Sequence, residues 1–223
     1  GKIHRQRFES WIDEQGKEHV GEPVTGLEIV GTTDKTGTKV SFKPDPKVFS
    51  SVQIQYDVLY ERLQEIAFLN SGLEILLRDE RTGKEDRFRY NGGASEFVQF
   101  LNEGKNVLHD VIHFYGEKDD VEVEIALQFN DGYTETILSF VNSIPTRGGG
   151  THETGFKTAY TRVMNDYARK IGVLKEKDKN LEGSDLREGM MAVINIKMNE
   201  VEFVGQTKDQ LGSALARSVV DAF

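Results

Sequence analysis

The run Val121–Phe129 constrains the fold more than any other stretch, because apolar side chains alternate along it with polar or small ones. This period of two is typical of a β-strand that packs one face and leaves the other in solvent. The turn signal "NDG" follows at residues 130–132. We therefore predict a hairpin in which residues 133–141 return as the partner strand.

A long helix is predicted over residues 151–171. At 100° per residue its larger apolar side chains share one arc, which we expect to be buried. These are Phe156, Ala159, Tyr160, Val163, Met164, Tyr167 and Ile171. A strand-like run at residues 190–198 and a small-residue helix at 213–220 follow, so the second half reads as an α+β domain.

The first half predicts shorter elements. We expect strands at residues 2–8, 27–30 and 38–42, an exposed loop or hairpin at 11–23, and a hairpin of strands 73–78 and 86–90. A helix is predicted over residues 57–70, with Asp57 capping its first turn, Gly72 as its left-handed stop and one buried face. That face comprises Val58, Leu59, Leu63, Ile66 and Ala67.

The charge argues against a uniform nucleic-acid-binding surface. The formal net charge is −9; before Gly92 there are 14 basic and 16 acidic residues, and after it 14 and 21, giving −2 and −7. Phosphate contacts would therefore need a local basic patch. Residues 147–170 offer one, with five basic and two acidic side chains. A strip along DNA (Lys157, Arg162 and Arg169) and an ordinary solvated helix face are both open.

Several classes of protein and site are disfavoured by composition. The chain has no Cys, so a disulfide framework and a thiolate metal site are excluded, and a cytoplasmic protein is expected. No apolar run approaches the ~18 residues of a membrane span. The five His residues form no convincing ligand pair, so no metal site is predicted in this chain. The opening residues read as mid-domain sequence, which suggests a fragment.

Two loops carry candidate binding groups. In "GQTKDQL", residues 205–211, an extended chain would direct Gln206 and Lys208 to the same side, where an amide and an ammonium suit a terminal phosphate. The alternative is a surface loop with a Lys208–Asp209 ion pair. The loop "RGGGTHETG" at residues 147–155 could bind an anion at a helix N-terminus, but a flexible loop whose Thr151 caps the following helix is favoured.

Taken together, several long strings resemble one protein family. They are "TDKTGT" from Thr33, "IAFLNSG" from Ile66, "LRDERTGKED" from Leu77, "GGTHETGFKTAYTRVMNDYARK" from Gly149, "DLREGMMAVINIK" from Asp185, and "GQTKDQLG". The chain resembles the B subunit of bacterial type IIA DNA topoisomerases over essentially its whole length. This family comprises the B subunits of DNA gyrase and of topoisomerase IV, and the strings "NDYARKIGVLKEKDKNLEG" and "ARSVVDAF" favour the topoisomerase IV branch.

The resemblance implies a fold and a domain boundary. Residues 1–92 would be the C-terminal portion of a Bergerat (GHKL) ATPase domain, and residues 93–223 a transducer domain similar to ribosomal protein S5 domain 2. The family's catalytic glutamate, its magnesium ligand, its adenine-binding aspartate and its ATP lid would lie upstream of Gly1. The isolated chain is therefore expected to hydrolyse no ATP.

The resemblance also implies site residues and partners. Lys208 would be catalytic and, with Gln206, would reach the ATP γ-phosphate, while Thr38 would lie at the adenine pocket. Lys157, Arg162 and Arg169 would face DNA. The whole protein would use ATP and Mg²⁺, dimerise as a clamp around double-stranded DNA and assemble with an A subunit. A non-catalytic dimerisation or DNA-binding module, or a MutL-like mismatch-repair ATPase, remains an alternative.

Overall fold

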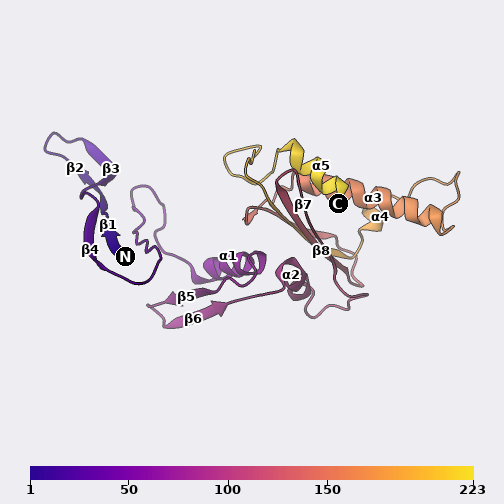
Figure 1. Cartoon of the computed structure of the whole chain (residues 1–223), viewed down its shortest axis with the longest axis horizontal. Coiled ribbons are helices and arrows are strands. Elements are labelled where there is room, and N and C mark those ends of the chain that lie inside the picture. The colour runs from indigo at the N-terminus through magenta and orange to yellow at the C-terminus, as the bar shows by residue number, and fades with distance from the viewer. The chain divides into compact units, whose positions relative to one another are not determined.

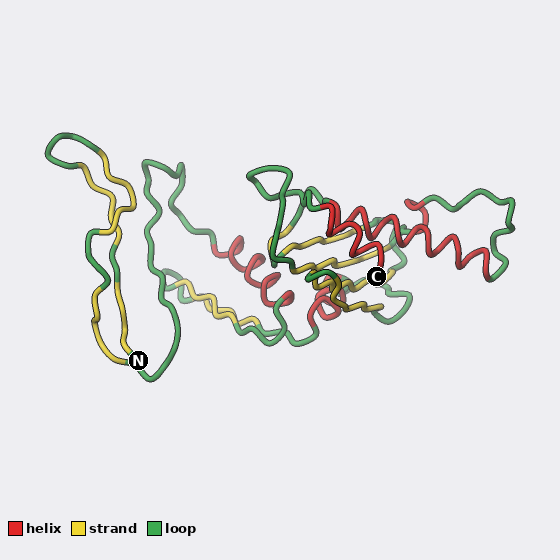
Figure 2. The backbone as a smooth tube through the Cα atoms, turned by 45° about the horizontal axis from the view of Figure 1, so that its top comes forward, coloured by secondary structure: helices red, strands yellow, loops and turns green.

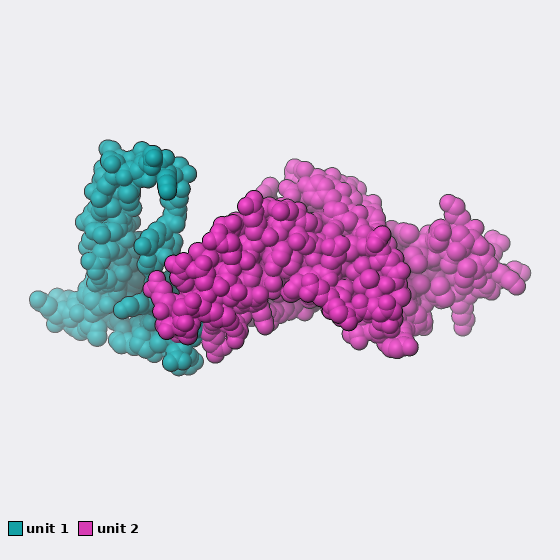
Figure 3. Space-filling model, turned by 90° about the horizontal axis from the view of Figure 1, so that it is seen from below, with its two compact units in different colours: residues 1–54 teal, residues 55–223 magenta.

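The computed structural model describes residues 1–223 as two compact units, unit 1 (Gly1–Ile54) and unit 2 (Gln55–Phe223), which Figure 3 colours separately. No helix combines the length and the apolar composition that crossing a membrane requires.

Unit 1 consists of two antiparallel strand pairs and loops. The pairs are β1 (Lys2–Arg5) with β4 (Glu28–Thr32), and β2 (Phe8–Ile12) with β3 (Glu18–Pro23). The expected hairpin at residues 11–23 is confirmed in β2 and β3. The single strand expected at residues 2–8 is wrong, because residues 6 and 7 are not in strand conformation. The two strands on either side of them, β1 and β2, pair with different partners.

The strand expected at residues 38–42 is also wrong, because no strand is found after β4 in this unit. Val40 and Phe42 are 79% and 76% exposed within it. All three clusters of buried apolar residues belong to unit 2. Unit 1 thus leaves its large apolar side chains without a core of their own.

Unit 2 is a five-stranded sheet with helices on both faces (Figures 1 and 2). Its strands run in the order β10-β9-β11-β8-β7. Before the sheet come α1 (Tyr56–Leu69), the hairpin β5 (Ile75–Asp79) and β6 (Lys84–Phe88), and α2 (Gly93–Leu101). The strands and later helices are β7 (Ile112–Lys118), β8 (Val121–Phe129), β9 (Thr136–Val141), β10 (Ile144–Pro145), α3 (Thr151–Lys170), α4 (Gly183–Leu186), β11 (Met190–Lys197) and α5 (Ala214–Ala222).

The strand Val121–Phe129 is confirmed, but its predicted partner is wrong. β8 and β9 are separated by β11, which pairs antiparallel with β8 and parallel with β9. The true hairpin partner of β8 is β7, joined through Asp119 and Asp120 with φ of 53° and 58°. Two successive left-handed residues match the twist of a tight hairpin, and Asp tolerates that conformation better than most residues do.

The face of β8 expected to be solvated is largely covered. Ala126 is fully buried in the cluster that α2 and Phe68 of α1 share with the sheet. Glu124 accepts a 3.0 Å hydrogen bond from the Ala94 amide in the first turn of α2. A carboxylate there satisfies a free amide and complements the helix dipole, so its polarity does not indicate exposure. The opposite face packs against α3 and α5.

The first helix follows the prediction in position but not at its N-terminal end. α1 begins at Tyr56 with no side-chain cap, and the Asp57 carboxylate lies instead 3.4 Å from Lys84 Nζ. Val58 is 60% exposed, so the buried face begins later in the helix than expected. Gly72 has φ 81°, which confirms the left-handed stop.

The predicted buried arc of α3 is correct only in its first turns. Phe156 is buried, whereas Val163, Tyr167 and Ile171 are 57%, 54% and 54% exposed. The reason is the length of the covering helix: α5 runs beside the start of α3, and Asp221 already lies opposite Arg162 (Figure 1). Beyond that point the apolar arc has no helix over it.

Candidate functional site

Residues 202–212 form a short hairpin after β11, between that strand and α5. Gly212 N donates to Glu202 O at 2.7 Å, and Val204 N donates to Gln210 O at 2.9 Å. The turn itself, residues 205–209, is closed by Lys208 N donating to Gly205 O at 3.2 Å. We call residues 205–209 the Lys208 tip.

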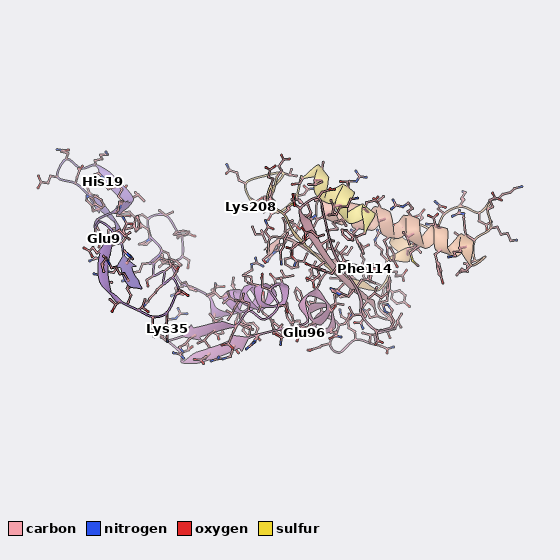
Figure 4. All side chains as sticks on the ribbon, in the orientation of Figure 1. Glu9, His19, Lys35, Glu96, Phe114 and Lys208 are labelled. Carbon is pink, nitrogen blue, oxygen red and sulfur yellow. The ribbon has the colours of Figure 1, made fainter.

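The Lys208 tip is a turn, so the extended geometry predicted for Gln206 and Lys208 is wrong. Lys208 has φ 59°, in the left-handed region. Gln206 and Lys208 are nevertheless both exposed in the turn at the end of the hairpin. Figure 4 shows Lys208 on a loop that projects from the body of unit 2.

The Lys208 ammonium has no carboxylate partner. No Lys208–Asp209 ion pair forms, and Nζ lies 5.9 Å from the centroid of the Phe203 ring. An aromatic face attracts a cation without neutralising it. The positive charge at the tip is therefore available to an anion.

The glycine loop, residues 147–150, lies against the downstream arm of this hairpin. Gly148 N donates to Asp209 O at 2.8 Å, Leu211 N to Gly149 O at 3.2 Å, and Thr151 N to Leu211 O at 3.1 Å. Because Gly150 is the N-cap of α3, the expected capping role of Thr151 is wrong. Its hydroxyl donates to Ser213 O at 2.7 Å, which adds a further tie to the start of α5.

Buried polar side chains hold the other side of the glycine loop. Thr146 Oγ1 lies 3.0 Å from His152 Nε2 and 2.7 Å from Ser139 Oγ on β9. His152 is fully buried, and its Nδ1 has no hydrogen-bond partner. Burial lowers the pKa of His152 from 6.5 to about 4, so the imidazole is neutral at neutral pH.

Lys157 on α3 lies in an ion cluster. Its Nζ is 3.0 Å from Glu135 Oε1 and 2.8 Å from Glu153 Oε1, and Arg187 Nε is 3.2 Å from Glu135 Oε2. Burial lowers the pKa of Lys157, but the hydrogen bonds to the two carboxylates outweigh it and raise the pKa above its usual value. The cluster contains two cations and two anions, so its formal charge is balanced.

Arg162 and Arg169 also have partners on the protein. Arg162 Nη1 lies 3.0 Å from Asp221 Oδ1. Arg169 donates through Nη2 to Asp178 O at 3.0 Å. Lys157 and Arg162, but not Arg169, line one polar hollow of about 510 Å³ along α3. The structure thus brings two of the three DNA-contact candidates to one surface.

Thr38 belongs to unit 1, where it lies in an exposed loop without a regular element. The nearby turn is held by Lys35 N donating to Thr33 Oγ1 at 3.0 Å. No group of three or more His, Asp or Glu side chains that could hold a metal ion occurs in the structure.

The comparisons with known proteins define the class first. The family model for DNA gyrase B matches residues 93–223, and the chain belongs to the DNA gyrase B family. The ATPase domain of Thermus thermophilus gyrase B, solved with an aminocoumarin, is 37% identical with a TM-score of 0.77, covering 100% of this chain and 58% of that one. Gyrase B of Myxococcus xanthus, 22% identical with a TM-score of 0.74, covers 96% and 63% and shares the fold.

Two curated relatives carry the name of the topoisomerase IV branch of the family. The B subunit of DNA topoisomerase 4 from Bacillus subtilis is 52% identical over 224 residues, covering 100% of this chain and 33% of that protein. The Streptococcus pneumoniae protein of the same name is also 52% identical, covering 99% and 33%. The chain thus spans about a third of the length of these relatives. The α+β fold class and the recognised family are confirmed, which sets aside the mismatch-repair alternative.

Some functional contacts were not predicted from the sequence. The i,i+4 spacing of Glu153 and Lys157 is the one local signal that could have indicated their ion pair. No local signal indicates the ion pairs of Glu135 and Asp221, because each joins segments far apart in the chain. The same holds for the backbone hydrogen bonds between the glycine loop and residues 209–211, which we call the clasp.

Proposed function

We propose that this chain is part of the ATP-operated clamp of a type IIA DNA topoisomerase, in which Lys208 contacts the γ-phosphate of ATP. The observation that carries the proposal is the unpaired ammonium of Lys208 at the exposed end of a hairpin. Membership of the DNA gyrase B family supplies the context of an ATPase. A compact ammonium suits a point contact with a terminal phosphate, where negative charge shifts during transfer.

The domain division that goes with this function has its boundary at Gly92 and Gly93. Residues 1–92 form the C-terminal portion of the GHKL ATPase domain, and residues 93–223 form the transducer. The DNA gyrase B match begins at residue 93, in support of this boundary. The strands of unit 1 leave large apolar side chains exposed and form no hydrophobic core. We expect this of a segment whose apolar side chains are covered by the rest of an ATPase domain.

The nucleotide-binding residues of this chain have distinct tasks. Lys208 and Gln206 bind the terminal phosphate, and Thr38 lies at the adenine pocket. Hydrolysis of the bound ATP resets the clamp. Mg²⁺ is proposed to accompany ATP, and no residue of this chain is assigned to it.

The partners of the whole protein are double-stranded DNA, a second copy of itself on ATP binding, and an A subunit. Lys157 and Arg162 line the hollow along α3, and this is the surface proposed to face DNA, with Arg169 further along the same helix. Each of these cations would have to exchange a present partner for a phosphate. Such phosphate contacts would make DNA binding, and the turnover that depends on it, sensitive to salt.

The test is Lys208→Ala in the full-length protein assembled with its A subunit. Removing one preorganised donor at a developing charge typically lowers the rate about 100- to 1,000-fold, so ATP turnover should fall by at least roughly a hundredfold. The affinity for an inhibitor that occupies only the adenine pocket should stay near the wild-type value, because Lys208 lies outside that pocket. Lys118→Ala, which removes another exposed lysine with no carboxylate partner, is the matched control. Near-normal turnover in Lys208→Ala would refute the γ-phosphate contact.

A further inference from the structure

The hairpin that carries Lys208 is held on both sides by backbone contacts. On its inner side, Phe203 and Leu211 form an antiparallel bridge across the hairpin. On its outer side, Gly150 and Leu211 form a parallel bridge to the glycine loop. Leu211 is 1% exposed and packs in the main core of the sheet. The arm leading out of the Lys208 tip is therefore the middle strand of a small three-stranded arrangement.

Within this arrangement, Gly150 is the position where an added side chain would fit worst. Its φ is 143°, and a Cβ placed there would lie 2.6 Å from both Leu211 N and Leu211 O. These are backbone atoms of a buried residue, so they cannot turn aside as a flexible side chain could. Any larger residue forces the glycine loop and residues 209–211 apart, because the close approach is possible only without a Cβ.

We infer that the glycine loop is a positioning element for the nucleotide site, and that Gly150 sets where Lys208 stands relative to α3. The inference rests on the proposed function of Lys208. Gly148 N binds Asp209 O, the residue directly after Lys208, so a displaced glycine loop releases the tip at its base. The same loop continues into α3, which carries Lys157 and Arg162. One rigid connection thus joins the phosphate-contacting hairpin to the helix proposed to face DNA.

Misplacing Lys208 should affect turnover more than nucleotide affinity. A displacement of about 1 Å in a catalytic group can cost about a hundredfold in rate. We expect Gly150→Ala in the full-length protein with its A subunit to lower kcat for ATP by roughly tenfold to a hundredfold. The KM for ATP and the affinity for an inhibitor that occupies only the adenine pocket should change far less.

The decisive experiment is a double-mutant cycle with Lys208→Ala. If Gly150 acts through Lys208, adding Gly150→Ala to Lys208→Ala lowers kcat no further. Gly104→Ala is the matched control, because Gly104 also has a positive φ, 77°, but no atom within 4 Å of its added Cβ. It places an alanine at a positive φ without the clash, although the strain at φ 77° is smaller than at the φ of 143° of Gly150. Should Gly150→Ala not fold, Gly148→Ala, whose Cβ lies 3.2 Å from Asp209 O, replaces it as a milder displacement.

A second readout measures the position of the tip without using ATP. Trypsin cleaves after Lys208, and a released tip should be cut at least several-fold faster in Gly150→Ala than in Gly104→Ala. Unchanged cleavage, or a kcat loss that persists in full in the Lys208→Ala background, would overturn the positioning role. Normal turnover in Lys208→Ala with faster cleavage in Gly150→Ala would instead refute the γ-phosphate contact. It would still support the conclusion that the glycine loop fixes the position of the Lys208 tip.

Discussion

His152 should make the stability of unit 2 depend on pH between about pH 6.5 and about pH 4. The side chain is fully buried, and burial lowers its pKa from 6.5 to about 4. The unfolded chain therefore binds the proton more readily than the folded chain, and stability is lost as the pH falls through this window. For these two pKa values, the loss between pH 7 and pH 5 is about 2 kcal/mol.

The measurement is urea unfolding of the chain at both pH values, followed by helical circular dichroism. All five helices lie in unit 2, so this signal reports the unit that contains His152. His152→Gln keeps a polar atom near Thr146 Oγ1 but cannot titrate in this range. Carboxylates elsewhere titrate in both proteins, so only the difference between them isolates His152.

The expected result is a pH-dependent loss of stability about 2 kcal/mol smaller in His152→Gln than in the wild type. If both proteins lose the same amount, the imidazole takes up its proton in the folded state as readily as in the unfolded state. The unpartnered Nδ1 would then not be the neutral, desolvated atom described above.

Two further predictions concern α1 and α3. Phe68→Ala should lower the free energy of unfolding by about 3–5 kcal/mol, because the ring is 1% exposed and its centroid lies 3.6 Å from that of Tyr90 and 4.7 Å from that of Phe97. A loss below about 1 kcal/mol in urea unfolding would contradict this packing. Lys157→Gln in the full enzyme should weaken DNA stimulation of ATP turnover and reduce the salt slope by about one unit. DNA-independent turnover should be unchanged; a wild-type slope would assign Lys157 to its ion cluster alone.

Element types were predictable from the sequence where a long periodic pattern was available. The run Met190–Lys197 and the helix Thr151–Lys170 were found within a few residues of their bounds. Pairing was not predictable for β8, because alternation indicates which face is packed but not which strand lies alongside. A turn signal at residues 130–132 wrongly favoured the next strand in the chain.

The loop that carries Gln206 and Lys208 was singled out from the sequence, but its geometry was not predicted. A glycine followed by Gln206 and Lys208 drew attention to residues 205–211, yet the left-handed turn at Lys208 arises from hydrogen bonds within residues 202–212 as a whole. The glycine loop was expected to be flexible because glycines permit many conformations. Its ordering comes from Leu211, which no local pattern in residues 147–150 could reveal.

The order β9-β11-β8 has a consequence for synthesis on the ribosome. The strand at the centre of the sheet is translated last, long after both of its neighbours have left the exit tunnel. Until Lys197 emerges, β8 and β9 each expose an unpaired hydrogen-bonding edge, and such edges promote association with other chains. Closing a sheet through distant and partly parallel contacts is also slow. Nascent chains of this sequence should therefore depend on chaperones that keep residues 121–141 from associating with other chains until the central strand is synthesised.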